Sequence, residues 1–149
     1  QFHETMKSVM SYYKGKVAWV YRFFPLTSLH PNAYTEAISL NCVGELGGTD
    51  AFWKYMDTVI GVTLGADAKS NEALTTFATQ SGVDGTLFKT CMNKKSDPRV
   101  DADIAEAQTI GARGTPYSVV VNQKTKKQAI IPGAAPLESV KQTIDSLLK

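Results

Sequence analysis

The sequence has few of the residues from which metal and redox sites are usually built. Two cysteines and two histidines occur among 149 residues, so no metal site and no cofactor is expected. The longest apolar runs are about six residues, far below the roughly 20 that a membrane helix needs. The net charge of +2 argues against nucleic acid or an anionic membrane as a partner, because either needs a concentrated basic face. The remaining composition, 43% hydrophobic and 20% charged, is that of one globular domain.

The first residues carry neither an initiator methionine nor an export signal. No basic segment followed by an apolar one precedes the first helical pattern, which begins at Gln1 itself. We therefore expect the chain to be processed or truncated at its N-terminus. For the same reason, the missing signal is no argument for the cytoplasm.

Hydrophobic spacing predicts the order of the secondary-structure elements. Residues 1–14 have helical spacing, and residues 16–24 are so apolar on both faces that we expect a central strand, covered on each side. A β-hairpin follows much later, over 117–121 and 127–131, and Pro136 opens a last helix. Between them we expect about five helices, one ending at Gly47-Gly48 and the next four capped by Asp50, Ser70, Asp84 and Asp97.

Gly114-Thr115-Pro116 directly precedes the first strand of the hairpin. A cis peptide bond before Pro116 would turn the chain sharply and present backbone groups to an extended ligand. An ordinary trans proline in a loop is the alternative, and the tripeptide alone leaves both open. His3, His30, Asp101 and Asp103 are interpreted as ordinary or solvated side chains rather than catalytic ones.

Cys42 and Cys91 both lie on apolar stripes of predicted helices. They are either free buried thiols or a structural disulfide, which would require an oxidising compartment. Cysteine arithmetic leaves these two possibilities open. Such a bridge, closing a loop of about 50 residues, could stabilise the fold by roughly 4 kcal/mol.

Several stretches together resemble the DsbA-like branch of the thioredoxin superfamily. They are Gln1-Phe-His-Glu-Thr5, the segment 17–26 ending Arg-Phe-Phe-Pro-Leu, Leu29-His30-Pro31, Phe52-Trp53, Gly111-Ala-Arg-Gly-Thr-Pro116, and Gly133-Ala134 with the last helix. The resemblance covers essentially all 149 residues. It implies an α/β fold, a thioredoxin-like sheet with an inserted helical domain. Residues 1–26 and 112–149 would form the thioredoxin-like part and 27–111 the insertion.

The resemblance also implies a site. In the family the proline corresponding to Pro116 is cis, and Thr115 with Pro116 would bind the substrate backbone. Cys42 and Cys91 are similar to a structural disulfide pair of some members. The family's catalytic Cys-x-x-Cys, and the strand leading into it, would lie just before Gln1, so no catalytic residue is expected between Gln1 and Lys149.

The function that the resemblance implies is thiol–disulfide exchange on protein cysteines. Unfolded or partly folded protein thiols and a membrane or soluble redox partner would be its partners, in an extracytoplasmic location: periplasmic, secreted or membrane-tethered. The alternative is a redox-inactive thioredoxin-fold module that binds peptides, and a glutathione-binding kappa-type isomerase ranks third. Because a central strand needs a neighbour on each side, we also expect residues before Gln1, or a second chain, to pair with 17–24.

Overall fold

The computed structural model of the protein describes residues 1–62 and 70–149 and divides the chain into two compact units. Unit 1 contains residues 1–22 and 110–149, and unit 2 contains residues 23–109. Each unit is described by itself below. None of the helices in the described residues combines the length and the apolar character needed to cross a membrane.

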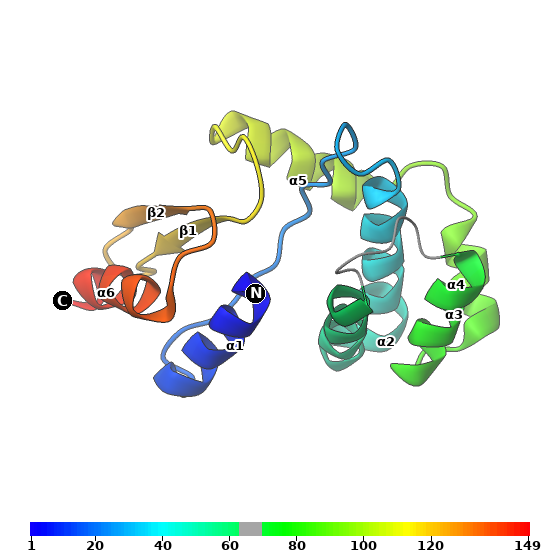
Figure 1. Ribbon diagram of the computed structural model, residues 1–149, viewed down its shortest axis with the longest axis horizontal. Helices are drawn as coiled ribbons and strands as arrows, with labels where there is room; N and C mark the ends of the chain where they lie inside the picture. Colours follow the sequence, from blue (N-terminus) through cyan, green and yellow to red (C-terminus); the bar gives the residue numbers. More distant parts are fainter. Residues whose placement is uncertain (63–69) are drawn as a thin grey trace. The chain divides into compact units, whose positions relative to one another are not determined.

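Unit 1 is a hairpin packed on two helices. Strands β1 (Tyr117–Val121) and β2 (Gln128–Pro132) pair antiparallel, with Val119 opposite Ile130. Helices α1 (Phe2–Tyr13) and α6 (Leu137–Leu148) supply the rest of the core (Figure 1). The core side chains follow the helical and strand spacing of the sequence: Val9 and Tyr13 from α1, Val120 and Ile131 from the hairpin, and Val140 and Ile144 from α6.

The hairpin buries only one of its two faces. Val120 and Ile131 point to the core formed with the helices, as alternation along a strand requires. On the opposite face Val119, Val121 and Ile130 are 37%, 38% and 55% exposed. This pattern is that of an antiparallel pair with one packed face and one solvent face.

Over its described residues, unit 2 has helices joined by loops and no strand. Its elements are α2 (Ala33–Val62), α3 (Asn71–Gln80), α4 (Gly85–Met92) and α5 (Pro98–Thr109). Helix α2 breaks at Gly48, where φ is 75°, so the predicted interruption at Gly47-Gly48 is confirmed. Ser70, Asp84 and Asp97 cap the next three helices through their side-chain oxygens, also as predicted. No hydrogen bond of the described residues makes Asp50 a cap.

The predicted strand over 16–24 is wrong for this structure. Residues 17–26 are neither helix nor strand, and the sheet of the described residues has only the order β1-β2 (Figure 1). Burial alternates along the segment: Val17, Trp19 and Tyr21 are half-buried, whereas Ala18, Val20 and Arg22 are exposed. The prediction that both faces of this segment are buried is therefore wrong too, since Val20 is 70% exposed. Apolar composition favours a strand, but a strand also needs a neighbouring backbone in ladder register, and the sheet of the described residues contains β1 and β2 alone. That residues before Gln1 or a second chain would pair with it stays a prediction.

Candidate functional site

The loop before β1 brings an exposed residue and a turn-forming proline together. The Thr115–Pro116 peptide bond is cis, Thr115 is exposed and Pro116 is half-buried. The carbonyl of Pro116 accepts a hydrogen bond from the Gly133 amide at 2.9 Å, which ties this loop to the end of β2. Gly133 has φ 81°, a left-handed conformation that favours glycine. The loop is thereby held at the start of the hairpin.

The backbone polar groups of Thr115 are not used within the described chain. Among the hydrogen bonds of the described residues, none uses the amide or the carbonyl of Thr115. Strand β1, which begins two residues later, pairs only with β2 in the part of the chain described here. An exposed, unpaired backbone segment at a strand edge is the arrangement that an extended peptide can join by main-chain hydrogen bonds.

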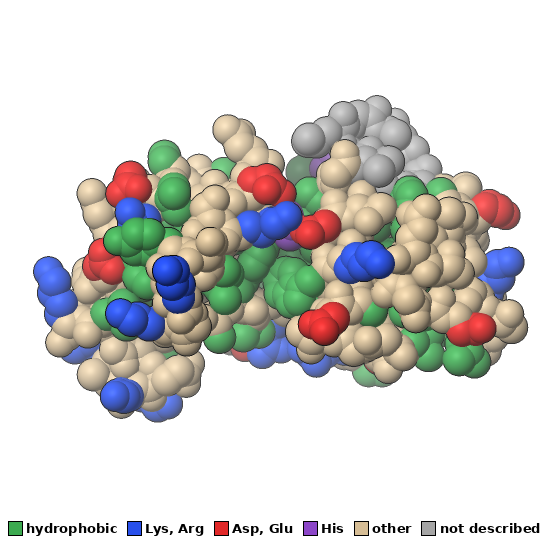
Figure 2. Space-filling view, turned by 90° about the horizontal axis from the view of Figure 1, so that it is seen from below, with side chains coloured by type: hydrophobic (Ala, Val, Ile, Leu, Met, Phe, Trp, Pro, Cys, Tyr) green, Lys and Arg blue, Asp and Glu red, His purple; other side chains and the backbone are tan. Residues whose placement is uncertain are grey.

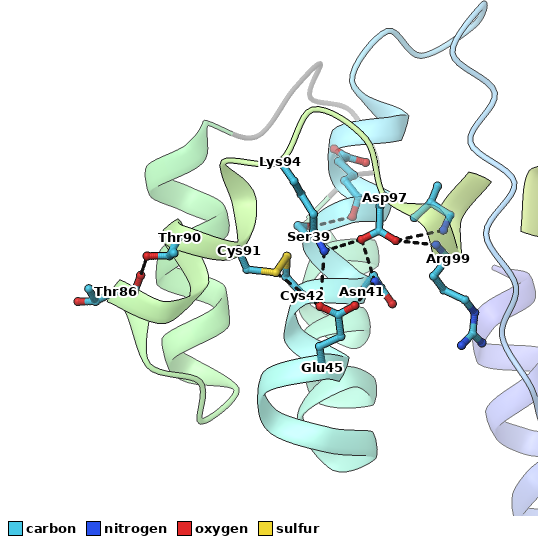
Figure 3. The surroundings of a disulfide bond; sticks show 12 residues. Ser39, Asn41, Cys42, Glu45, Thr86, Thr90, Cys91, Lys94, Asp97 and Arg99 are labelled. Atoms are coloured by element: carbon cyan, nitrogen blue, oxygen red, sulfur yellow. Dashed lines mark hydrogen bonds and ion pairs between the residues drawn. A yellow bond between two sulfur atoms is a disulfide. The ribbon is translucent and has the colours of Figure 1, made fainter. Parts of the chain in front are cut away.

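Cys42 and Cys91 form a disulfide, so the predicted bridge is confirmed (Figure 3). It joins α2 to α4, and the Cα atoms of the two cysteines are 5.9 Å apart. Cys42 is fully buried on the apolar side of α2, whereas Cys91 is half-buried. Since these are the two cysteines of the sequence, no free thiol remains between Gln1 and Lys149.

The surroundings of the disulfide oppose thiol chemistry. The Cys91 sulfur lies 3.8 Å from the Glu45 carboxylate, and Cys91 is in the last turn of α4. A neighbouring carboxylate and the negative end of a helix both disfavour a thiolate, which is the reactive form of cysteine. Lys94 offsets only part of this field, because its Nζ lies 3.5 Å from Glu45 and closer to another carboxylate. The arrangement is therefore that of a structural bridge.

Asp97 supplies the other carboxylate that Lys94 contacts, and its side chain is buried, with the residue only 1% exposed. It receives Lys94 Nζ at 2.6 Å and Asn41 Nδ2 at 2.9 Å, while its other oxygen accepts the Arg99 amide in the first turn of α5 (Figure 3). Burial raises the pKa of Asp97, but these hydrogen bonds outweigh it and hold the pKa below its ordinary value. Burial likewise lowers the pKa of Lys94, and the two carboxylates outweigh it in the opposite direction. The network fastens α5 to α2 beside the disulfide.

A family model described as thioredoxin matches residues 1–146. The chain belongs to the thioredoxin family. No curated protein and no solved structure matches it. Membership gives the mixed α/β fold of six helices and a small antiparallel sheet over the described residues, and it supports a redox or disulfide-related role. In this thioredoxin-family chain, Thr115 is exposed and Pro116 is half-buried in the loop before β1.

The two histidines lie in different units of the chain. The ring of His3 lies 5.3 Å from that of Trp19, and His30 is exposed in unit 2. Among the described residues, no group of three or more His, Cys, Asp or Glu side chains is placed to hold a metal ion.

The interpretation of Asp101 and Asp103 as solvated charges is wrong for Asp103. Asp103 is 2% exposed and accepts the Phe23 amide at 3.0 Å. Asp101 is exposed, and it also accepts the Tyr34 hydroxyl at 2.6 Å. The spacing of residues along one helix could not predict these contacts, because Phe23 and Tyr34 are far from Asp103 and Asp101 in the sequence.

Proposed function

We propose that the protein is a thiol–disulfide oxidoreductase of the DsbA-like type, acting on cysteines of protein substrates. The observation that carries the proposal is the exposed backbone of Thr115, whose amide and carbonyl take part in none of the hydrogen bonds of the described residues, directly before β1. A substrate segment that adds to this backbone would lie extended, with its own cysteine free to react. Thr115 and Pro116 are thus assigned to substrate binding.

The reacting cysteines of this proposal are not Cys42 and Cys91. Exchange proceeds through a mixed disulfide, and one pair of thiols is oxidised to a disulfide as the other disulfide is reduced to two thiols. The field around Cys91 opposes that step, and Cys42 is fully buried. The proposal therefore includes a Cys-x-x-Cys just before Gln1 in the intact protein. It also includes an extracytoplasmic location, unfolded protein thiols as substrates and a separate redox partner.

The alternative is a redox-inactive module that binds peptides in the same place. The observation that favours it is that both cysteines between Gln1 and Lys149 are joined in a structural disulfide. The two proposals share the peptide site and differ only in whether chemistry follows binding.

One experiment separates them. The intact protein and the chain Gln1–Lys149 are compared in oxidation and reduction of a cysteine-containing substrate protein, and in binding of an extended peptide without cysteine. The oxidoreductase proposal expects turnover by the intact protein and none by the shorter chain. Peptide binding by both proteins without any turnover would refute it in favour of the binding module.

A variant then tests the assigned site. Pro116→Ala in the intact protein should slow release of mixed disulfides more than it lowers stability. Pro136→Ala is the matched control, because Pro136 is an exposed proline of the same unit at the start of α6. Equal effects of the two substitutions on turnover would contradict a substrate-binding role for Pro116.

A further inference from the structure

The charge of the chain is divided unequally between the two units. Unit 1 contains ten Lys and Arg against three Asp and Glu, a formal +7. Unit 2 contains six against eleven, a formal −5. The near-neutral +2 of the whole chain is the sum of these two opposite values. The near-neutral total therefore does not exclude an anionic partner for unit 1.

The basic residues of unit 1 are largely unbalanced. Its three acids are already engaged: Glu4 with Lys7, Glu138 with Lys141, and Asp145 with the Tyr13 hydroxyl. Several exposed cations of the described chain have no acidic partner within ion-pair distance; they are Lys14, Lys16, Arg113, Lys124, Lys126, Lys127 and Lys149. Figure 2 shows Lys and Arg side chains gathered on the left of the view, where unit 1 lies.

Four of these lysines lie at one end of unit 1. Lys124, Lys126 and Lys127 are all exposed in the turn between β1 and β2. Asn122 at the start of that turn donates to the Leu147 carbonyl at 2.6 Å, which places the end of α6 and Lys149 beside it. We call Lys124, Lys126, Lys127 and Lys149 the lysine end.

Exposed apolar side chains accompany the lysine end. Val121 precedes the turn and is 38% exposed, and Leu148 precedes Lys149 and is 51% exposed. The end is a protruding turn and a helix terminus, and its cations are flexible lysines rather than arginines. Arginine and aromatic side chains, which recognise bases and planar anions in fixed geometry, are lacking there. A protruding group of lysines with apolar neighbours fits a flat, diffuse anionic surface.

We infer that the lysine end docks on the surface of a bilayer containing anionic phospholipids. Each lysine near such a surface strengthens binding about fivefold, and the attraction extends about one Debye length, roughly 10 Å at 0.1 M salt. The lysine end lies at the opposite end of β1 from Thr115, about 17 Å away for a five-residue strand. Docking would therefore leave the loop at Thr115 and Pro116 accessible, and it does not depend on the proposed redox activity.

The test measures partition of the protein onto vesicles of phosphatidylcholine and phosphatidylserine in about a 2:1 ratio, at low and high salt. The variant is Lys124→Gln/Lys127→Gln/Lys149→Gln. Lys126 is left in place because its φ of 61° makes substitution there a test of the turn as well. The matched control, Lys54→Gln/Lys89→Gln/Lys95→Gln, removes the same charge from three exposed lysines of unit 2.

The inference expects binding of the unchanged protein at low salt, loss of that binding at high salt, and no binding to pure phosphatidylcholine. The lysine-end variant should bind about 100-fold more weakly, whereas the control variant should bind as the unchanged protein does. Circular dichroism checks that both are folded, and Lys149→Gln alone, expected to bind about fivefold more weakly, serves if the triple variant is not.

Three results would overturn the inference. Equal losses in the two triple variants would show that only net charge matters. Equal binding to neutral vesicles would show that the apolar residues act alone. Binding to soluble polyglutamate without binding to vesicles would show an acidic polypeptide as the partner.

Discussion

Replacing Asp97 by asparagine should be one of the most destabilising single-atom changes in unit 2. The substitution keeps the size of the side chain and one oxygen, which can still accept the Arg99 amide and cap α5. The other oxygen becomes an amide nitrogen, and it would face Lys94 Nζ at 2.6 Å and Asn41 Nδ2 at 2.9 Å. All three groups are donors, so the two hydrogen bonds are lost and an ammonium loses its partner.

The expected cost is about 3 kcal/mol in the free energy of unfolding, the lower range for breaking a buried ion pair. The lower value is expected because Glu45 stays 3.5 Å from Lys94 and still partly neutralises its ammonium group. A second change, Lys94→Met, removes the unpaired ammonium. The double variant should therefore recover about 1–2 kcal/mol relative to the sum of the two single changes.

The assay is chemical unfolding followed by tryptophan fluorescence. The chain has one tryptophan in each unit, so Trp19→Phe leaves Trp53 of α2 as the reporter for unit 2. Asp84→Asn is the matched control, because Asp84 caps α4 but is exposed and forms no ion pair within the described part of the chain. Asparagine caps helices about as well as aspartate, so this control should change stability by less than about 0.5 kcal/mol.

The dependence on pH gives an independent reading. Because the pKa of Asp97 is lower in the folded than in the unfolded chain, its contribution is present above the unfolded value, about 4, and is lost as pH falls below it. The difference between the unchanged protein and Asp97→Asn should thus shrink at acidic pH. Equal stability of the Asp97 and Asp84 variants at pH 7, or a difference that persists unchanged in acid, would refute the argument.

Three further predictions concern other contacts. Reduction of the Cys42–Cys91 disulfide, which spans 49 residues, should lower the stability of unit 2 by about 4 kcal/mol, and denaturant curves with and without reductant will measure it. Gly47→Ala should cost about 1–3 kcal/mol because its new methyl would lie 2.6 Å from Ala51 and 2.8 Å from Val83, whereas Gly61→Ala, with open space around it, should not destabilise. Tyr13→Phe should cost unit 1 about 1–2 kcal/mol by removing the 2.7 Å hydrogen bond to Asp145, with Trp19 as the reporter in a Trp53→Phe background; no change would show that this hydrogen bond contributes nothing net.

Features that depend on neighbours in the sequence were predictable. Ser70, Asp84 and Asp97 cap helices because an oxygen on a short side chain reaches amides two or three residues later. The break at Gly48 follows from a left-handed conformation that favours glycine. The Gly-Thr-Pro tripeptide likewise indicated the loop before β1, whereas substrate binding by Thr115 and Pro116 stays a prediction.

The sequence by itself thus determined most of the helices, the caps Ser70, Asp84 and Asp97, the hairpin and the two cysteines that could pair. Tertiary structure decided whether they did, because only the packing of α4 on α2 brings the two Cα atoms to 5.9 Å. It also decided that residues 17–24 form no strand with the described chain, that Asp103 is buried on the Phe23 amide, and that Lys149 at the end of α6 lies beside the three lysines of the hairpin turn. Each of these depends on a partner distant in sequence, and periodicity describes only which face a residue occupies, not what lies opposite it.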